Sequence, residues 1–280
     1  MSFNSVNTNR QAVFALQSLN QTNSELGFTQ KRVSTGYRVA DARDDGGAFA
    51  VAQAVRSDVA GITAVGEQLG GTRGILSTTF ASLSVVSDTM KQIRATLTRL
   101  ADGAVTGGSR TSYQEQYTLL VDQMSKFIDD AQYNGRTLLS TDTSVGVGGG
   151  NIISIRNETG GSFTIEAVNG ADLKLTSVAP TTATAAAAFL QPTTGLFDIA
   201  DAAISSALNK FGAQMQYVEN QTVYNSKKTD AMNDGLGALV DADLAKESSL
   251  LQALQTRQQL GVQTLSLANQ GPQVLLSLFR

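Results

Sequence analysis

A seven-residue apolar repeat runs through the first long stretch of this chain. From Ala48, every seventh position is apolar, and the row comprises residues 48, 55, 62, 69, 76, 83, 90 and 97. A second row carries Ala52, Val59 and Phe80, with interruptions at Gly66, Arg73, Ser87 and Arg94. Spacing that alternates three and four places one apolar seam along a helix. The repeat predicts a helix of about fifty residues, roughly 75 Å long at 1.5 Å per residue.

Two further helices are predicted from the same kind of spacing. The three prolines, at 180, 192 and 272, leave segments 1–140 and 196–271 free of helix breakers. The second helix carries apolar residues at 113, 117, 120, 124 and 127, and the third carries them between Phe197 and Leu239, with polar Thr222, Asn225 and Thr229 among them. Because a lone amphipathic helix gains little stability, these helices must bury their seams on each other. The predicted fold is mainly α, a long helical rod or coiled-coil bundle.

The two ends of the chain repeat in a different register. One N-terminal row holds Ala12, Leu19, Leu26 and Val33, and stepping on by seven reaches Gly47, one residue short of Ala48. The C-terminal row that begins at Leu244 starts one residue off the row that ends at Leu239. A register shift turns a seam away from its former partner. We therefore expect a bend in segment 34–47, and three parts: an N-terminal arm 1–42, a bundle 43–239, and a C-terminal arm 240–280 that pairs with the first arm.

The segment between the helical regions lacks the seven-residue repeat. Apolar and polar residues alternate on both sides of Gly160 and Gly161, which predicts a β-hairpin over about 151–168. Segments 141–151 and 180–195 are of low complexity, and we expect them to be exposed loops. No large outer domain fits in this region.

Composition excludes several classes of function. The 280 residues include no cysteine and no histidine, which removes disulfides, thiolate and imidazole metal ligands, and the commonest catalytic base. A net charge of -3 without a basic stripe argues against nucleic acid binding. No stretch reaches the ~18 apolar residues of a membrane span, and the start lacks a secretory signal pattern. We expect no enzyme activity, cofactor or metal, no membrane insertion, and a protein that is cytosolic or exported by a route that reads no such signal.

Three local patterns allow more than one interpretation. Asp44 and Asp45 could form a carboxylate pair or a calcium site, but the glycines that follow favour a solvated bend. Residues 70–74 contain glycines as a phosphate loop does, without its lysine or its full spacing. Asn23, Gln30 and Gln258 stand where heptads expect aliphatic residues, and they are either tolerated imperfections or residues that fix register and partner.

Four segments resemble the two ends of bacterial flagellin. They are VNTNRQAVFALQSLNQTNSEL continuing into KRVSTGYRVADARDDGGAFAVAQ, then QYNGRTLL, and finally QQLGVQTLSLANQGPQVLLSLFR. The resemblance covers roughly 1–140 and 196–280, in the order that the family shows. The wording DADLAKES is similar to flagellins of alphaproteobacteria in particular.

This resemblance implies a structural subunit that polymerises into the extracellular flagellar filament for motility. In flagellins, both arms form an inner coiled-coil layer and the bundle lies outside it. Implied partners are further copies of the chain, a flagellar export chaperone, and hook-associated and cap proteins. The alternatives are a hook-filament junction protein, or a secreted adhesin displayed on a helical stalk. The expected assembly interface comprises Leu16, Leu19, Leu26, Val33, Leu244, Leu251, Leu254, Leu265, Leu275, Leu276, Leu278, Phe279 and Arg280.

Overall fold

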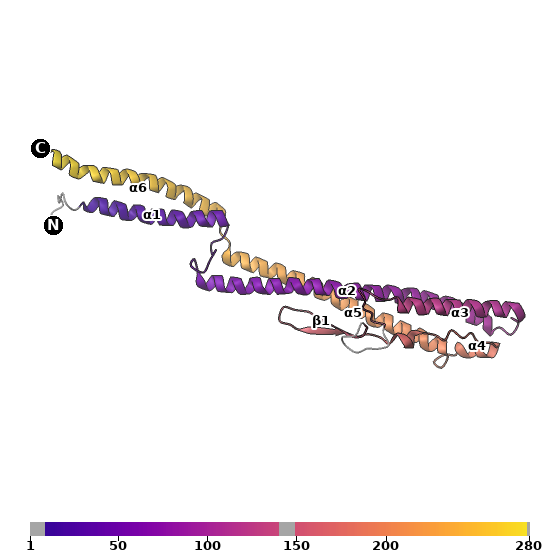
Figure 1. Ribbon diagram of the computed structural model, residues 1–280. Helices are drawn as coiled ribbons and strands as arrows, with labels where there is room; N and C mark the ends of the chain where they lie inside the picture. Colours follow the sequence, from indigo (N-terminus) through magenta and orange to yellow (C-terminus); the bar gives the residue numbers. More distant parts are fainter. Residues whose placement is uncertain (1–8, 140–148, 279–280) are drawn as a thin grey trace. The chain divides into compact units, whose positions relative to one another are not determined.

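The fold is mainly helical, with one small antiparallel sheet, as predicted. A computed structural model describes residues 9–139 and 149–278, and side chains as far as residue 270. Its elements are α1 (Arg10–Thr35), α2 (Gly46–Ala101), α3 (Gly107–Asp129), β1 (Ile152–Ile155), β2 (Ser162–Ile165), a 3-10 turn η1 (Gly170–Leu173), α4 (Ala183–Phe189), α5 (Leu196–Val240) and α6 (Leu244–Leu278) (Figure 1). The chain divides into two compact units, residues 1–57 with 231–280, and residues 58–230.

The seam of α2 organises the core of the 58–230 unit. The first predicted row is confirmed, since Ile62, Leu69, Leu76, Leu83, Met90 and Leu97 are all buried. The second row is corrected in part: Ala52 is buried and Val59 and Phe80 are half-buried, but Arg73 and Arg94 are exposed. The buried residues lie three positions after each member of the first row, at Val65, Thr72, Thr79, Val86, Ile93 and Leu100. The described seam therefore continues without the predicted interruptions.

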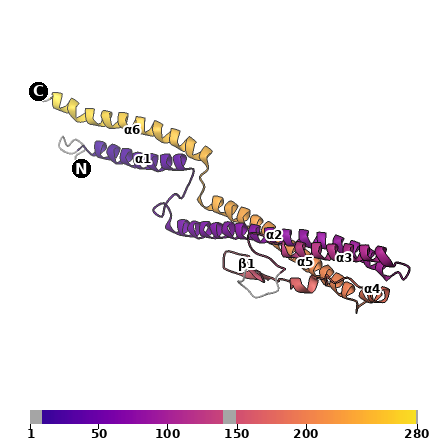
Figure 2. The same ribbon diagram turned by 45° about the vertical axis from the view of Figure 1, so that its right-hand side comes forward.

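Helices α3 and α5 supply the other walls of this core, as the sequence pattern predicted. In both views they run alongside α2 (Figures 1 and 2). Their contributions are Tyr117, Val121, Met124 and Ile128 from α3, and Phe197, Ala200, Ile204, Ala207, Phe211 and Val218 from α5. Arg110 secures the turn from α2 to α3, because its guanidinium donates to the carbonyls of Leu100, Asp102 and Val105. These bonds satisfy carbonyls that the end of a helix leaves unpaired.

The predicted hairpin is confirmed. Strands β1 and β2 pair antiparallel, with Ile152 opposite Ile165 and Ile155 opposite Ser162. In the turn, Gly160 adopts a φ of 82°, a conformation that glycine takes without strain. The Ser154 hydroxyl lies 3.2 Å from the hydroxyl of Thr72, so a buried polar position of α2 meets a partner on the sheet.

The tip of the hairpin lies against the polar part of α5. Gln221 and Asn225 both donate to the carbonyl of Arg156, and Lys228 forms an ion pair with Glu158. The hydrogen bond from Lys228 holds the pKa of the Glu158 carboxyl below its usual range. The polar gap in the apolar pattern of α5 is therefore the place where the hairpin docks.

The expected loop over 180–195 is corrected in part. Residues Ala183–Phe189 form helix α4, which Thr182 caps by accepting a hydrogen bond from the Ala185 N–H. Ala186 is fully buried, and the Phe189 ring meets Tyr117 edge-on with centroids 6.4 Å apart. Alanine is the best helix former, and here the helix is also fixed by packing. The predicted loop over 141–151 lies mostly outside the described residues.

Replacing residues 181–188 with a Gly/Ser linker should lower the free energy of unfolding by about 2 kcal/mol or more. Glycine in place of alanine costs up to about 1 kcal/mol per helical position, and the contacts of Ala186 are lost. Urea unfolding of the linker variant measures the effect. Ala187→Ser, at an exposed position of the same helix, is the matched control. Equal stability of the linker variant and the parent would show that α4 contributes nothing to the core.

Tyr117→Phe should change the alkaline stability of this unit. Burial raises the pKa of Tyr117 to about 12, and its hydroxyl donates to the Thr176 carbonyl. Because the folded pKa lies above the unfolded value, the resulting stability is complete below pH 10 and is lost as the pH rises toward 12. The variant should lose about 1 kcal/mol at pH 8 and show a flatter pH dependence from 10 to 12.

Urea unfolding at pH 8 and pH 11 checks this expectation for Tyr117. Tyr224→Phe is the control, because the Tyr224 side chain is exposed. If the free energy of unfolding fell by the same amount from pH 8 to pH 11 in the parent and in Tyr117→Phe, the assignment of the alkaline transition to Tyr117 would be contradicted.

Candidate assembly interface

Helices α1 and α6 form an antiparallel pair within the unit of residues 1–57 and 231–280 (Figures 1 and 2). Arg32 of α1 lies 3.1 Å from Glu247 at the start of α6. Further along, the Gln258 amide donates to the Asn23 side chain over 2.8 Å, and Asn9 donates to the Ala268 carbonyl over 2.7 Å. Asn9 also accepts from the Ala12 N–H and so caps α1, while Asp243 caps α6. Contacts therefore follow the pair along most of its described length.

The seam between the two helices differs in one row from the predicted seam. The predicted row of Leu16, Asn23 and Gln30 is exposed, and Ala15, Thr22 and Thr29 occupy the facing side. From α6, the facing residues are Glu247, Leu251, Leu254, Gln258, Gly261, Leu265 and Ala268. Among residues 10–35 and 244–270, only Thr29, Glu247 and Leu254 are buried. The pair therefore has a seam, but only a thin core.

The residues predicted for assembly fall into three groups. Leu254 is buried, and Leu19, Leu26, Val33, Leu251 and Leu265 are half-buried between α1 and α6. Leu16 and Leu244 are about half exposed and lie off the seam. Leu275, Leu276 and Leu278 belong to α6, and their side chains lie outside the described residues, as do Phe279 and Arg280 entirely.

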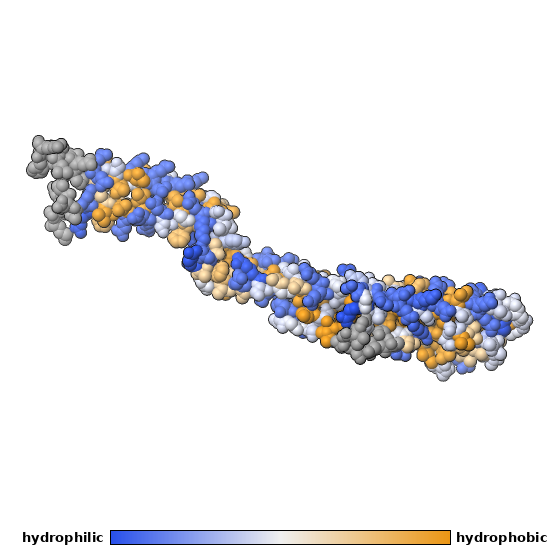
Figure 3. All heavy atoms as spheres, viewed as in Figure 1, coloured by the Kyte–Doolittle hydropathy of each residue, from blue (hydrophilic) through white to orange (hydrophobic). Residues whose placement is uncertain are grey.

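Large apolar side chains also lie on the outer sides of this pair. On α1, Val13, Phe14 and Phe28 are exposed, with Phe14 at 68%. On α6, the exposed residues are Leu250, Leu260, Val262 and Leu267, the last at 70%. Figure 3 shows apolar side chains gathered over these two helices among polar ones. The predicted residues included none of these seven, because the sequence argument considered only the face that joins α1 to α6.

The bend predicted over 34–47 is confirmed, and its interior is more bonded than expected. Lys31 lies 2.9 Å from Asp41 and 2.8 Å from Asp44, whose carboxylate also accepts the N–H groups of Ala40 and Asp41. The hydrogen bond from Lys31 is the largest cause of the lowered pKa of Asp44. Asp45 caps α2 by accepting from Ala48. The expectation of a solvated bend therefore holds for Asp45, which is exposed, and is wrong for the Asp44 side chain, which is 13% exposed.

Apolar packing holds the same bend. Val39 is buried with Ala52 of α2 and Val240 of α5, and the N–H groups of Arg38 and Val39 both donate to the Val240 carbonyl. Gly36 ends α1 with a φ of 75°. This geometry explains why glycine and two aspartates occur in the connection.

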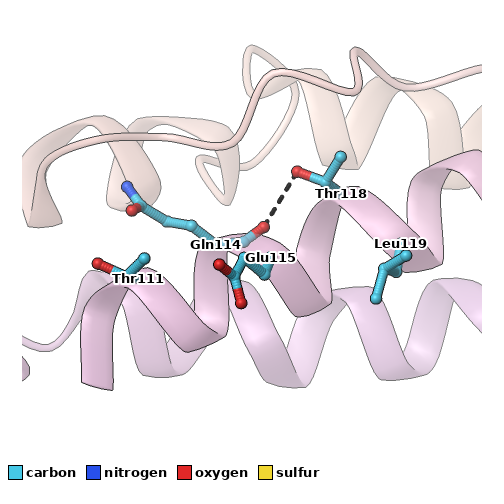
Figure 4. Close-up of a pocket in the computed structure, with 5 residues that line it drawn as sticks. All are labelled: Thr111, Gln114, Glu115, Thr118 and Leu119. Carbon is cyan, nitrogen blue, oxygen red and sulfur yellow. Dashed lines mark hydrogen bonds between the residues drawn. The ribbon is translucent and has the colours of Figure 1, made fainter. Parts of the chain in front are cut away.

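The 58–230 unit carries an open groove on α3. Its volume is about 500 Å³, and it is lined by Thr111, Gln114, Glu115, Thr118 and Leu119 (Figure 4). Thr118 donates to the Gln114 carbonyl over 3.0 Å. Glu115 is the one ionisable side chain among the described lining residues, so this groove offers no acid and base pair.

Other candidate sites find no support in the described part of the chain. Residues 70–74 lie inside α2 and form no loop that could hold a phosphate. Within residues 9–139 and 149–270, no group of three acidic side chains is placed to hold a metal ion. None of the described helices is long and apolar enough to cross a membrane.

Comparison with known proteins tests the resemblance found in the sequence. Residues 6–143 match the family model of the bacterial flagellin N-terminal helical region, and residues 195–279 match that of the C-terminal helical region. The flagellin FljK of Caulobacter vibrioides is 34% identical over 282 residues, with all of both chains covered. The chain belongs to the bacterial flagellin family. A flagellin of Brucella melitensis is 32% identical, with 99% of each chain covered, which agrees with the alphaproteobacterial resemblance.

Among solved structures, Bacillus cereus flagellin matches 66% of this chain and 94% of its own, with 17% identity and a TM-score of 0.35. As a flagellin, the chain is a structural subunit that polymerises into the flagellar filament used for motility. The family matches favour this function over a junction protein or an adhesin.

Asp44→Asn should make filaments less resistant to heat at neutral pH, because Lys31 loses its main charged partner. The pKa of Asp44 is lowered in the folded chain, so its stabilising contribution exists above the usual carboxyl range and disappears as the pH falls through the folded pKa. The difference from the parent should therefore vanish in acid. Sedimentation of filaments after heating at several pH values measures this.

The matched control for Asp44→Asn is Asp45→Asn, since asparagine also caps a helix. Asp45→Asn filaments should resemble the parent at each pH. Equal heat resistance of Asp44→Asn and parent filaments at neutral pH would show that the bend does not depend on this ion pair.

Proposed function

We propose that the paired arms α1 and α6 are the main assembly surface of this flagellin, and that they gain their full stability only in the filament. The observation that supports this most directly is the thin seam between them, with Leu254 the only large apolar side chain fully buried among residues 10–35 and 244–270. Apolar residues on their outer sides, such as Phe14 and Leu267, need a partner to leave water. Neighbouring copies of the chain provide that partner.

The expected interface residues have distinct roles in this proposal. Leu19, Leu26, Val33, Leu251, Leu254 and Leu265 join the arms of one subunit, while Leu16 and Leu244 face neighbouring subunits. Leu275, Leu276, Leu278, Phe279 and Arg280 extend the second arm into contacts between subunits. The proposed division is an N-terminal arm 1–42, a bundle 43–239 and a C-terminal arm 240–280, with the arms in the inner layer of the filament and the bundle outside.

The route to the filament is part of the same proposal. The chain is exported unfolded through the flagellar secretion apparatus with the help of an export chaperone, and it adds to the distal tip beneath cap proteins. Hook-associated proteins adjoin the finished filament. The absence of cysteine supports this route, because a disulfide would obstruct passage of an unfolded chain through a narrow channel.

The terminal segment provides a test of the assembly surface. Burying one Val, Leu or Phe side chain is worth ~1.5 to 3 kcal/mol. The five apolar residues between Val274 and Phe279 would therefore contribute on the order of 10 kcal/mol to the free energy of assembly, before the entropy of ordering the segment is subtracted. A chain that stops after Gly271 should therefore keep the helical content and melting of its bundle and fail to form filaments. Circular dichroism, sedimentation and electron microscopy measure these properties.

Two matched full-length variants show which part of the segment acts. One replaces Val274, Leu275, Leu276, Leu278 and Phe279 with glutamine, and it should behave like the truncated chain. The other carries Gln273→Ala with Ser277→Ala, and it should assemble. Normal filaments from the truncated chain would refute the proposal, and a collapsed bundle would place the segment in the core of the monomer.

A further inference from the structure

The apolar rows of α1 and α6 do not by themselves select one offset between the helices. The main row of α1 has Ala12, Leu19, Leu26 and Val33 at intervals of seven, and α6 has Leu251 and Leu265 fourteen residues apart. A slip of seven residues, about 10.5 Å along the helix axis, brings another apolar member of the α1 row to the same place, while on α6 it brings Gln258 to the place of a leucine. The apolar residues of α1 would still lie along α6. A second feature must therefore fix the register.

One candidate is a notch in α6 at Gly261. A Cβ atom at this position would stand 3.1 Å from Leu19 Cδ1 and 3.9 Å from Leu19 Cβ, so the Leu19 side chain fills the space that glycine leaves. The groove beside the notch is lined by residues of both helices, including Thr22 and Leu260. A slip of seven would move Leu19 from Gly261 to Leu254 or Ala268, both of which carry a side chain where the notch offers none.

The other candidate is the amide pair of Asn23 and Gln258. The Gln258 Nε2 donates to Asn23 Oδ1 over 2.8 Å, and this is the side-chain hydrogen bond nearest to the notch between the two helices. After a slip of seven, Asn23 would face Leu251 or Leu265, and Gln258 would face Leu16 or Gln30. Three of these four encounters set an amide against a leucine. Asn23 is exposed and Gln258 is half-buried, so water replaces part of the lost bond and the slip costs the ~1 kcal/mol of one hydrogen bond.

Among the remaining contacts between the helices, Asn9 carries little register information, because it donates to a backbone carbonyl and a helix offers a carbonyl at every residue. Arg32 lies 3.1 Å from Glu247, whose side chain is only 11% exposed, so this ion pair also favours the observed register. It is left in place in every variant compared below.

We propose that Asn23 and Gln258 are positioning residues, which together with the Leu19–Gly261 notch select a single register of the two arms. This amide pair stabilises the two helices less than two leucines would, but it favours one register, as a polar pair does in a coiled coil. This inference rests on the proposed pairing of the arms in the filament. Its consequence is that every subunit presents the same outer surface to its neighbours.

The chain offers a clean readout, since it contains no cysteine of its own. A Cβ separation of 3.9 Å between positions 19 and 261 suits a disulfide, whose Cβ atoms lie about 3.8 Å apart. Leu19→Cys with Gly261→Cys therefore reports the observed register. Leu19→Cys with Ala268→Cys reports a slip of seven. Both reporters replace Leu19 and so remove the notch. The three backgrounds compared below therefore differ only in the residues at positions 23 and 258.

The experiment compares both reporters, after mild oxidation of filaments, in three backgrounds. With Asn23 and Gln258 present, the 19–261 disulfide should dominate on non-reducing gels. With Asn23→Leu and Gln258→Leu, the ratio of 19–261 to 19–268 product should fall at least about fivefold, since one hydrogen bond of about 1 kcal/mol changes a population by that factor. The exchanged pair Asn23→Gln with Gln258→Asn should restore most of the preference.

A matched control adds the same apolar surface off the seam, through Gln17→Leu with Gln263→Leu, and it should leave the ratio unchanged. Mixing chains that carry single cysteines identifies disulfides between subunits. A ratio that is equal in the amide and leucine backgrounds would overturn the inference while the pairing stands. Absence of the 19–261 disulfide in every background would overturn the inference together with the proposed pairing of the arms.

Discussion

Burial of one helical seam against another is the interaction on which each part of this flagellin depends. In the 58–230 unit, the seam of α2 meets α3, α5 and the hairpin, and its leucines from Leu69 to Leu100 are inaccessible to water. In the other unit, α1 and α6 have only each other along most of their length. A two-helix pair can shield one side of each helix and no more. The same kind of heptad pattern therefore gives a complete core in one unit and an incomplete one in the other.

This difference connects the structure to the function of the family. A subunit must stay soluble before assembly and then bind many copies of itself. The bundle buries its own seams, and its buried threonines and the tip of the hairpin find hydrogen-bond partners. The arms leave apolar side chains such as Phe14 and Leu267 exposed in the single chain. Segments that order when a partner arrives couple their folding to binding.

The sequence was sufficient for the long helices, the hairpin and the two breaks in the helical chain, and insufficient for half of each seam and for helix α4. In α2, the row of Ile62 to Leu97 was visible because its members are large and apolar. Its companion row contains Thr72 and Thr79, whose hydroxyls bond Ser154 and the Ile75 carbonyl, so that hydropathy alone favoured a row with Phe80. Positions three and four residues away on a helix are equally adjacent, and only the partner decides between them.

For the same reason, the second row of α1 was predicted to contain Leu16, whereas in the structure Ala15 and Thr22 face α6. Helix α4 was not predicted because a short alanine run becomes ordered only through the burial of Ala186 against residues far away in the sequence. Contacts across the arms, such as Gly261 with Leu19, could not be read from one chain without knowing the register. The polar heptad positions at Asn23 and Gln258 were the one signal in the sequence that pointed to that register.

In the proposed assembly, the arms are held weakly in the single chain and firmly in the filament. Hydrogen exchange, followed peptide by peptide in soluble subunits and in filaments, measures this directly. We expect slow exchange in α3 and in residues 58–100 of α2 in both states. In α1 and α6, exchange should be fast in the soluble subunit and become slow only in the filament. Equally slow exchange of α1 and α6 in the soluble subunit would contradict the claim that assembly completes their folding.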